Sequence, residues 1–335
     1  MTMTRRTMIA GAGTALPLVN IRRARAAQFS LKLGHAQTVT HPLNVRTQEA
    51  AAAIRKSSDG QLDMRVFPNS QLGSELDMLA QVRSGSLDMV ATSILFLEPV
   101  VPDVNLSGLG YAFRNTAQVW QAWDNAFGDD IRKQIAAAGN ITVFDKTFDN
   151  GFRQVTSSVR PIKGPEDLHG LKIRVPSIRV QQSIFTHLGA APTTVNIKEA
   201  YSALQTHIAD AEENALTSID LFKFYEVQKY CSMTNHMWDG FWIMSSSASL
   251  ATLPDALRHL VTTTFDDAAL KQRADMAALT TKLRGQLEAH GLVFNEPEFQ
   301  PFRDALKASG FYAEWRGRAS PAVWSLLEKT TGPLT

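Results

Sequence analysis

The chain has 335 residues, of which 44% are hydrophobic and 20% charged, with a formal net charge of +2 at pH 7. This composition is typical of a globular protein, and the chain is long enough for two lobes with separate cores. The near-neutral charge, without a basic stripe interleaved with aromatic residues, argues against a nucleic-acid partner. The single cysteine, Cys231, excludes an internal disulfide framework and is expected to be a small buried hydrophobe.

Residues 1–27 have the features of an export signal. Arg5 and Arg6 precede a modest apolar run from Met8 to Val19, and Ala24-Arg25-Ala26-Ala27 supplies a small-x-small cleavage site. Paired arginines are typical of the twin-arginine route, and a basic N-terminal tail is the alternative. No run of about 18 apolar residues follows, so we expect the mature protein to be free in the periplasm.

The next segments alternate between strand and helix patterns. Apolar residues alternate from Phe29 to Leu33, which predicts a strand, and a helix is expected from about Pro42 to Ser58. A second strand is predicted at 62–66, a helix from the cap at Ser74 to Gly85, and a third strand at 87–91. This order predicts a doubly wound α/β sheet.

A helical stripe of large apolar residues is predicted next, formed by Trp120, Trp123, Phe127, Ile131 and Ile135. Such a stripe indicates a helix face in the core, and it ends at Gly139 before a strand at 141–144. Asp149-Asn150-Gly151 is a turn signal between extended segments. We therefore expect the chain to pass from one lobe to the other near this turn.

The second half repeats the alternation and adds one long helix. A strand is predicted at 171–175, helices at 178–188 and after Asn196, and a strand at 208–213. From Pro254 to His290 the pattern is helical almost throughout, which at ~1.5 Å per residue corresponds to about 50 Å. Such a helix would brace both lobes, unless it is two helices broken near Asp266-Asp267.

The common catalytic templates are missing from the sequence. It contains no phosphate-binding glycine loop of the Walker type, no Gly-x-Ser-x-Gly elbow and no pair of histidines at zinc-binding spacing. We therefore predict neither a cofactor nor a metal site.

Two arginines stand out as candidate ligand groups. Arg174 lies inside the apolar strand pattern Leu171–Val175, where a guanidinium is costly unless it is paired. It has two interpretations, an internal salt bridge or a clamp for a ligand carboxylate, which arginine binds bidentately. Arg153 follows the expected lobe junction and by itself is equally consistent with a surface position.

Four segments together resemble the solute-binding proteins of tripartite ATP-independent periplasmic (TRAP) transporters, of the dicarboxylate-binding (DctP) type. They contain Phe67-Pro-Asn-Ser-Gln-Leu-Gly73, Asp167-Leu-His-Gly-Leu-Lys-Ile-Arg-Val-Pro176, Glu199-Ala-Tyr-Ser-Ala-Leu-Gln205 with Glu213-Asn214, and Lys223-Phe-Tyr-Glu-Val-Gln-Lys-Tyr230 with Thr234-Asn-His236. The segments follow one another along essentially the whole mature chain. The resemblance implies a two-lobed type II periplasmic-binding-protein fold that closes over its ligand and docks on a membrane permease.

The resemblance also implies which residues bind. Arg174 matches the main carboxylate ligand of the family, Arg153 a second and more variable arginine, and Asn214 a polar residue that contacts the carboxylate. By analogy of position, the further candidates on the cleft are His35, Ser93, Trp238, Phe241 and Ile197. Ile197 falls where some sialic-acid-binding members carry an aromatic residue, which argues against that ligand.

The sequence therefore predicts a monomeric, exported solute-binding protein for a small organic acid. Lobe I is expected to comprise 28–150 plus roughly 240–279, and lobe II 151–239 plus roughly 280–335. The alternatives are an exported α/β enzyme using Glu213 or His35 as acid or base, and a ligand sensor that signals to a receptor. Two arginines permit a dicarboxylate as well as a 2-hydroxy or 2-keto acid, and aromatic residues near 238–241 would favour an apolar or aromatic acid.

Overall fold

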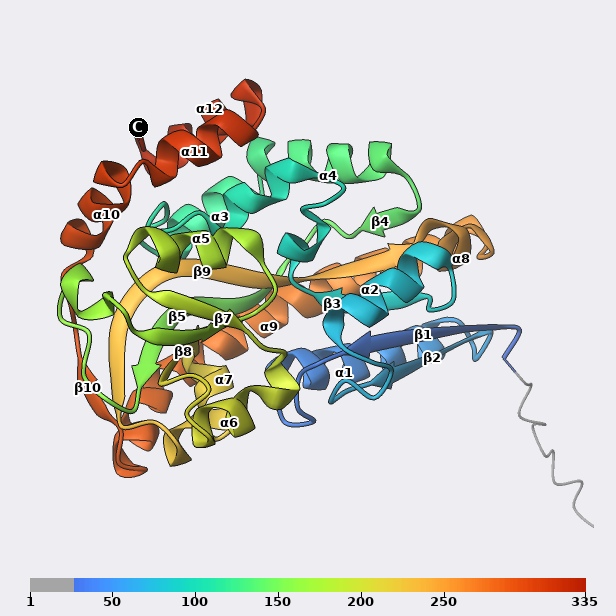
Figure 1. The fold of residues 1–335 in the computed structure, drawn as a ribbon. Coiled ribbons are helices and arrows are strands. Elements are labelled where there is room, and N and C mark those ends of the chain that lie inside the picture. The colour runs from blue at the N-terminus through green and yellow to red at the C-terminus, as the bar shows by residue number, and fades with distance from the viewer. Residues whose placement is uncertain (1–26) are drawn as a thin grey trace, which may run out of the picture.

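The computed structural model describes residues 27–335, so all but the last residue of the predicted export signal lies outside the described residues. The strands are β1 (Phe29–His35), β2 (Leu62–Phe67), β3 (Met89–Thr92), β4 (Ile141–Val143), β5 (Phe148–Ser157), β6 (Lys172–Val175), β7 (Ala191–Thr194), β8 (Ala211–Ala215), β9 (Tyr230–Ser246) and β10 (Val293–Asn295). They form one mixed sheet in the order β2-β1-β3-β9-β5-β8-β6-β7, with β4 and β10 also paired to β9 (Figure 1).

The long strand β9 joins two groups of strands. In the first strand group, β1 is parallel to β2 and β3, and β3 is antiparallel to the later part of β9. In the second strand group, β5 is antiparallel to β8 and to the earlier part of β9, while β6 is parallel to β7 and β8. Both groups contain the parallel pairs that a β-α-β alternation produces, as the sequence predicted.

The helices of the first strand group begin and end at the expected signals. They are α1 (Pro42–Ser57) and α2 (Glu75–Ser84). Before α2, the Ser74 hydroxyl accepts a hydrogen bond from the Asp77 backbone N–H, and the Asp77 carboxylate accepts one from the Ser74 backbone N–H. This reciprocal pair confirms the predicted capping box, and Gly85 ends the helix in a left-handed conformation with φ 77°.

The apolar stripe of residues 120–135 lies on two helices, so the prediction of one helix was wrong. They are α3 (Thr116–Trp123) and α4 (Ala126–Ala138), and the chain turns the corner between them at Asp124 and Asn125. A Cβ atom on Gly128 would lie 2.0 Å from the Trp123 carbonyl oxygen, so this corner requires glycine. The stripe itself packs into the core, with Trp123, Phe127 and Ile131 each at most 2% exposed.

The expected turn at Asp149-Asn150-Gly151 is instead a bulge inside β5, so that prediction was also wrong. The register against β9 shifts between Asp149, which pairs with Gly240, and Gly151, which pairs with Asp239. Gly151 has φ +98°, a conformation that favours glycine. The strand therefore continues past residue 150, and the bulge re-aims the side chains around it.

The helices of the second strand group are α5 (Arg179–His187), α6 (Ile197–Gln205) and α7 (Leu216–Leu221). Four short 3₁₀ segments also occur: η1 (Ile94–Leu97), η2 (Pro102–Gly108), η3 (Pro165–Leu168) and η4 (Phe224–Glu226). The chain continues through α8 (Ser247–Ala251) and ends in α10 (Phe299–Ala308), α11 (Phe311–Arg318) and α12 (Pro321–Thr331). The last three helices cross over α5, α3 and α4 (Figure 1).

One unbroken helix, α9 (Asp255–Ala289), connects the cores of both strand groups. Val261 and Phe265 pack with Leu33 of β1, whereas Leu283 and Leu287 belong to a separate core that includes buried Cys231. The bracing helix is confirmed, and the alternative of a break at residues 266–267 is wrong. No helix within residues 27–335 is both long and apolar enough to cross a membrane.

Candidate functional site

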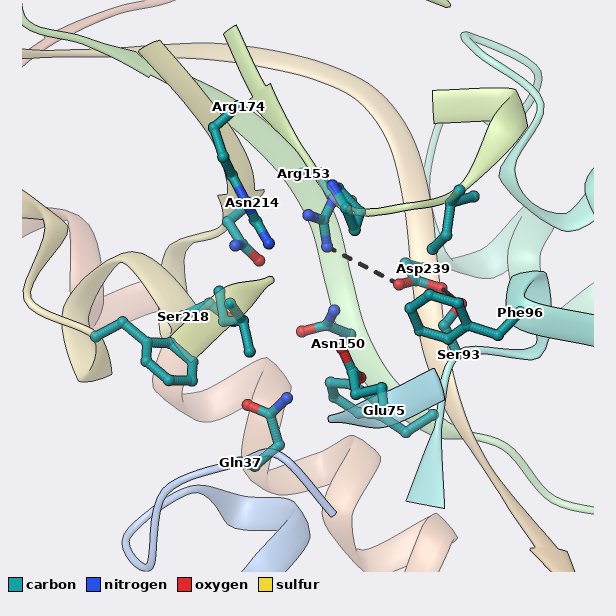
Figure 2. Close-up of a pocket in the computed structure, with 15 residues that line it drawn as sticks. Gln37, Glu75, Ser93, Phe96, Asn150, Arg153, Arg174, Asn214, Ser218 and Asp239 are labelled. Carbon is teal, nitrogen blue, oxygen red and sulfur yellow. Dashed lines mark hydrogen bonds and ion pairs between the residues drawn. The ribbon is translucent and has the colours of Figure 1, made fainter. Parts of the chain in front are cut away.

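A cavity lies where the two strand groups meet, and both contribute to its walls (Figure 2). Six of the eight predicted site residues line it: Arg153, Arg174, Asn214, Ser93, Phe241 and Ile197. Ser93 follows β3 in the first strand group, whereas the two arginines and Asn214 lie on β5, β6 and β8 of the second. A molecule bound in the cavity would therefore contact both strand groups at once.

Arg174 is buried in the cavity wall with little compensation for its charge. It is 2% exposed, and its Nε donates to the Val195 carbonyl oxygen at 2.8 Å. No carboxylate within residues 27–335 forms an ion pair with it, and burial lowers the pKa of the guanidinium. Figure 2 shows the guanidinium directed into the cavity beside Asn214. Its two Nη groups are thus the donors that a ligand carboxylate can use.

Arg153 is the arginine that carries the internal salt bridge. Its Nε is paired with Glu213 Oε2 on the neighbouring strand, and its Nη2 donates to Glu213 Oε1 and to the Glu213 carbonyl oxygen, each at 2.8 Å. Burial alone would raise the pKa of Glu213, but the Arg153 charge and a hydrogen bond to His236 lower it to about 2. Glu213 is therefore ionised and balances Arg153, whose Nη1 also lies 3.8 Å from Asp239 Oδ2.

Asn214, which lines the cavity, is hydrogen-bonded to Glu212, which does not line it. The Asn214 Nδ2 donates to Glu212 Oε2 at 3.3 Å. Glu212 is fully buried, and its Oε1 accepts a hydrogen bond from the Thr156 hydroxyl at 3.0 Å. Burial raises the pKa of Glu212 to about 7, and the nearby Arg174 charge offsets this only in part.

Two carboxylates that the sequence reasoning missed, Glu75 and Asp239, line the cavity away from Arg174. Glu75 stands in the first turn of α2, where its Oε1 accepts from the Thr92 hydroxyl at 2.9 Å. Asp239 on β9 accepts from the Ser93 hydroxyl at 2.8 Å and from the Gly240 N–H at 2.9 Å. Burial raises the pKa of both carboxyls.

The remaining two predicted residues, His35 and Trp238, are not among the residues that line the cavity. Side chains alternate along a strand, so Asp239 and Phe241 face the cavity while Trp238 points away, and its Nε1 donates to Asp149 Oδ1 at 2.8 Å. His35 is fully buried at the end of β1, with its Nε2 at 3.2 Å from Asn44 Oδ1. Burial lowers the pKa of His35 to about 4.

Two contacts span the gap between the strand groups beside the cavity. Lys198 Nζ at the start of α6 donates to the Ser70 carbonyl oxygen at 2.9 Å. Arg179 Nη1 at the start of α5 lies 3.2 Å from Glu98 Oε1, which follows η1. Each contact joins segments from opposite sides of the cavity, as expected for a closed arrangement.

The chain is similar in sequence to proteins that bind solutes outside the cytoplasm. The family model for bacterial extracellular solute-binding protein, family 7 (DctP), matches residues 33–314. An uncharacterized protein, y4mM of Sinorhizobium fredii, is 33% identical over 254 residues, which cover 75% of this chain but 47% of that protein. The 2,3-diketo-L-gulonate-binding periplasmic protein YiaO of Escherichia coli is 29% identical over 283 residues, covering 84% of this chain and 85% of YiaO.

The fold is shared with solved structures. One is a TRAP periplasmic solute-binding protein from a Bradyrhizobium species in complex with galacturonate, which is 27% identical. It superposes with a TM-score of 0.84 and covers 91% of this chain and 100% of that one. These matches confirm both the family resemblance and the two-lobed α/β fold that the sequence predicted.

Proposed function

The chain belongs to the bacterial extracellular solute-binding protein family 7, and we propose that it captures a small organic acid by placing the acid's carboxylate on Arg174. The family comprises solute-binding proteins rather than enzymes, so the chain is a binding protein. The observation that carries the proposal is the buried Arg174 guanidinium, which has no ion-pair partner within residues 27–335 and faces the cavity.

In this proposal three side chains receive the carboxylate. Arg174 supplies its two Nη donors, Asn214 supplies its amide from the adjacent strand, and Arg153, whose charge Glu213 balances, adds its Nη1 as a further donor. Charge-assisted hydrogen bonds contribute about 1.5–3 kcal/mol each. Two such bonds together with burial suffice for micromolar affinity, about −8.2 kcal/mol, after the entropy of ordering the ligand is subtracted.

Ligand capture is coupled to closure of the two lobes. We assign 28–150 plus roughly 240–279 to lobe I and 151–239 plus roughly 280–335 to lobe II. A ligand that touches Ser93 and Phe241 on one side and Arg174 and Ile197 on the other binds the closed form better, and so shifts the population toward it. The closed form then presents its surface to the membrane permease of a TRAP transporter.

The setting of this function follows from the N-terminal sequence and the family. We propose that Arg5 and Arg6 direct the chain through the twin-arginine route and that the mature protein works in the periplasm as a monomer. The relatives support the ligand class, because one is named for binding 2,3-diketo-L-gulonate and another was solved with galacturonate, and both compounds are small organic acids.

A thermal-shift screen tests the proposal with three proteins: wild type, Arg174→Ala and the control Arg55→Ala, whose side chain is 63% exposed. An acid at 100 times its dissociation constant adds about 2.7 kcal/mol to the free energy of unfolding. We expect this shift in wild type and Arg55→Ala but not in Arg174→Ala. Without ligand, Arg174→Ala should melt at or above the wild-type temperature, because an unpaired buried charge is lost.

Two outcomes would contradict the proposal. One is a ligand shift that persists in Arg174→Ala with the same dependence on acid concentration. The other is a folded wild-type protein that responds to none of a panel of sugar acids, 2-hydroxy and 2-keto acids, dicarboxylates and aromatic acids.

A further inference from the structure

Only one of the two arginines that line the cavity is available to neutralise a ligand carboxylate. Of these two arginines, Arg153 is neutralised by Glu213, to which it makes three hydrogen bonds. Arg174 alone has no ion pair within the part of the chain that the structure describes. Counting arginines in the sequence suggested two carboxylate positions, but the ion pair removes one of them.

The rest of the cavity wall carries acceptors and negative charge. Glu75 uses Oε1 for Thr92, and its Oε2 has no hydrogen-bond partner within residues 27–335. Asp239 uses Oδ1 for Ser93 and for a backbone N–H, while its Oδ2 lies 3.8 Å from Arg153 Nη1. Each carboxylate therefore keeps one oxygen that can accept a hydrogen bond from a ligand.

Two side-chain amides at the same wall have buried oxygen atoms without a hydrogen-bond partner. Gln37 is 7% exposed and Asn150 is 3% exposed, and both line the cavity. Gln37 Oε1 and Asn150 Oδ1 are buried without a hydrogen-bond partner in the described chain. Figure 2 shows both amides directed into the space between Arg174 and Glu75. Buried polar groups are nearly always paired, so these amides point to a ligand rich in hydroxyl groups.

We propose that the cavity selects an acid with one carboxylate and several hydroxyl groups, and that Glu75 and Asp239 determine this specificity. Both accept hydrogen bonds from ligand hydroxyls, and both repel a second carboxylate. The three phenylalanines that also line the cavity, Phe96, Phe222 and Phe241, pack against the C–H faces of such a molecule. The inference rests on the proposed role of Arg174, and it separates this chain from binders of dicarboxylates.

Three six-carbon acids separate the effect of ligand hydroxyl groups from the effect of a second carboxylate. Gluconate has one carboxylate and five hydroxyls, hexanoate has the carboxylate without hydroxyls, and glucarate has four hydroxyls with a second carboxylate. Galacturonate adds a ring form, and succinate and benzoate represent short dicarboxylates and aromatic acids. Titration calorimetry at pH 8 gives a dissociation constant for each acid.

We expect gluconate or galacturonate to bind at least about 100-fold more tightly than hexanoate, because lost hydroxyls leave buried acceptors unpaired. A similar preference of about 100-fold over glucarate is expected, because like charges face each other in the closed cavity. Equal or tighter binding of glucarate, succinate, hexanoate or benzoate would overturn the inference. If that binding still depends on Arg174, the proposed function stands while the inference falls.

Two isosteric variants test the assigned residues. Glu75→Gln and Asp239→Asn remove the negative charge, so each should narrow the preference for gluconate over glucarate by about tenfold or more. Glu49→Gln, at a carboxylate that is 55% exposed, is the control and should leave the ratio unchanged. The ratio is measured within one protein, so it is independent of how much of a variant is folded. An unchanged ratio in both cavity variants would contradict the role of Glu75 and Asp239.

Discussion

Arg174 and Glu212 lie opposite each other on the paired strands β6 and β8, yet they form no ion pair. Each still feels the charge of the other, which lowers the pKa of Glu212 against the larger effect of burial. A buried carboxyl group and a buried guanidinium are thus close enough to affect each other's pKa without forming an ion pair. This arrangement leaves Arg174 free for a ligand, and it makes Glu212 sensitive to pH.

Glu212→Gln should change how stability depends on pH. The pKa of Glu212 is about 7 in the folded protein, above its ordinary value of 4.5, so the folded state binds the proton more tightly than the unfolded state. The stability that this provides is fully present below about pH 4.5 and is lost as pH rises through about 7. The variant has no carboxyl group at this position and does not lose this stability. Relative to wild type, its free energy of unfolding should therefore rise by up to about 3 kcal/mol between low pH and pH 8.

Chemical denaturation of both proteins from pH 5 to pH 8.5 measures that difference. Asp266, whose pKa burial raises to about 6, contributes equally to both proteins and cancels in the comparison. Curves for wild type and variant that stay parallel across this range would contradict the assignment of Glu212.

Arg153→Met should destabilise the fold strongly. It leaves the buried Glu213 without its ion-pair partner and with only the neutral contacts to His236 and Gln181, which costs about 3–5 kcal/mol. The double variant Arg153→Met, Glu213→Gln removes both charges and should recover part of that loss. Urea denaturation at pH 7 gives the free energy of unfolding for the wild type, the single variants and the double variant. A double variant no more stable than Arg153→Met would argue against the ion pair as the cause.

Gln272→Ala should loosen the long helix from the sheet. Gln272 is fully buried in α9, where its Oε1 accepts from the Asp149 N–H and its Nε2 donates to the Asp149 carbonyl oxygen, each at 2.7 Å. Truncation leaves both backbone groups without a side-chain partner, at a cost of about 1–3 kcal/mol for each buried group. Gln286→Ala, at an exposed position of the same helix, is the control and should stay within about 0.5 kcal/mol. Similar losses in both variants would contradict the prediction.

Lys198→Met should speed ligand release. The variant removes the donor to the Ser70 carbonyl oxygen but keeps the apolar stem, so the closed form loses one contact between the two strand groups. A loss of about 1 kcal/mol corresponds to roughly a fivefold faster dissociation. Stopped-flow release of a bound acid measures this rate, with Lys282→Met on the exposed side of α9 as the control. Release at the wild-type rate would show that this contact does not hold the closed form.

The sequence predicted the features that depend on local pattern. The capping box at Ser74, the helix ends and the long helix α9 each follow from signals within a few residues, and the structure has them. The cost of burying a charge singled out Arg174 in its apolar strand, but it left open whether an internal salt bridge or a ligand carboxylate pairs with it. The same reasoning applied to Asp239, which lies among aromatic residues, would have found a second wall residue.

The features that were missed depend on distant parts of the chain. The bulge at residues 149–151 exists because β9 supplies the partner strand, which no local turn signal reveals. The break between α3 and α4 is a local exception: Gly128 lies close to the Trp123 carbonyl oxygen, and the apolar stripe continues across the break and hides it. Glu75 resembles any acidic residue in a first helical turn, where it suits the helix dipole, so its place on the cavity is visible only in three dimensions.

The position of β9 between the two strand groups has a consequence for the order of folding. Met89 of β3 pairs with Ser245 of β9, so the N-terminal sheet lacks its inner neighbour until the ribosome has made most of the chain. Proteins with several domains commonly fold each one as it emerges, but here neither lobe is complete before the other. Both should therefore acquire their native pairing together and late, and pairing across so many residues is slow.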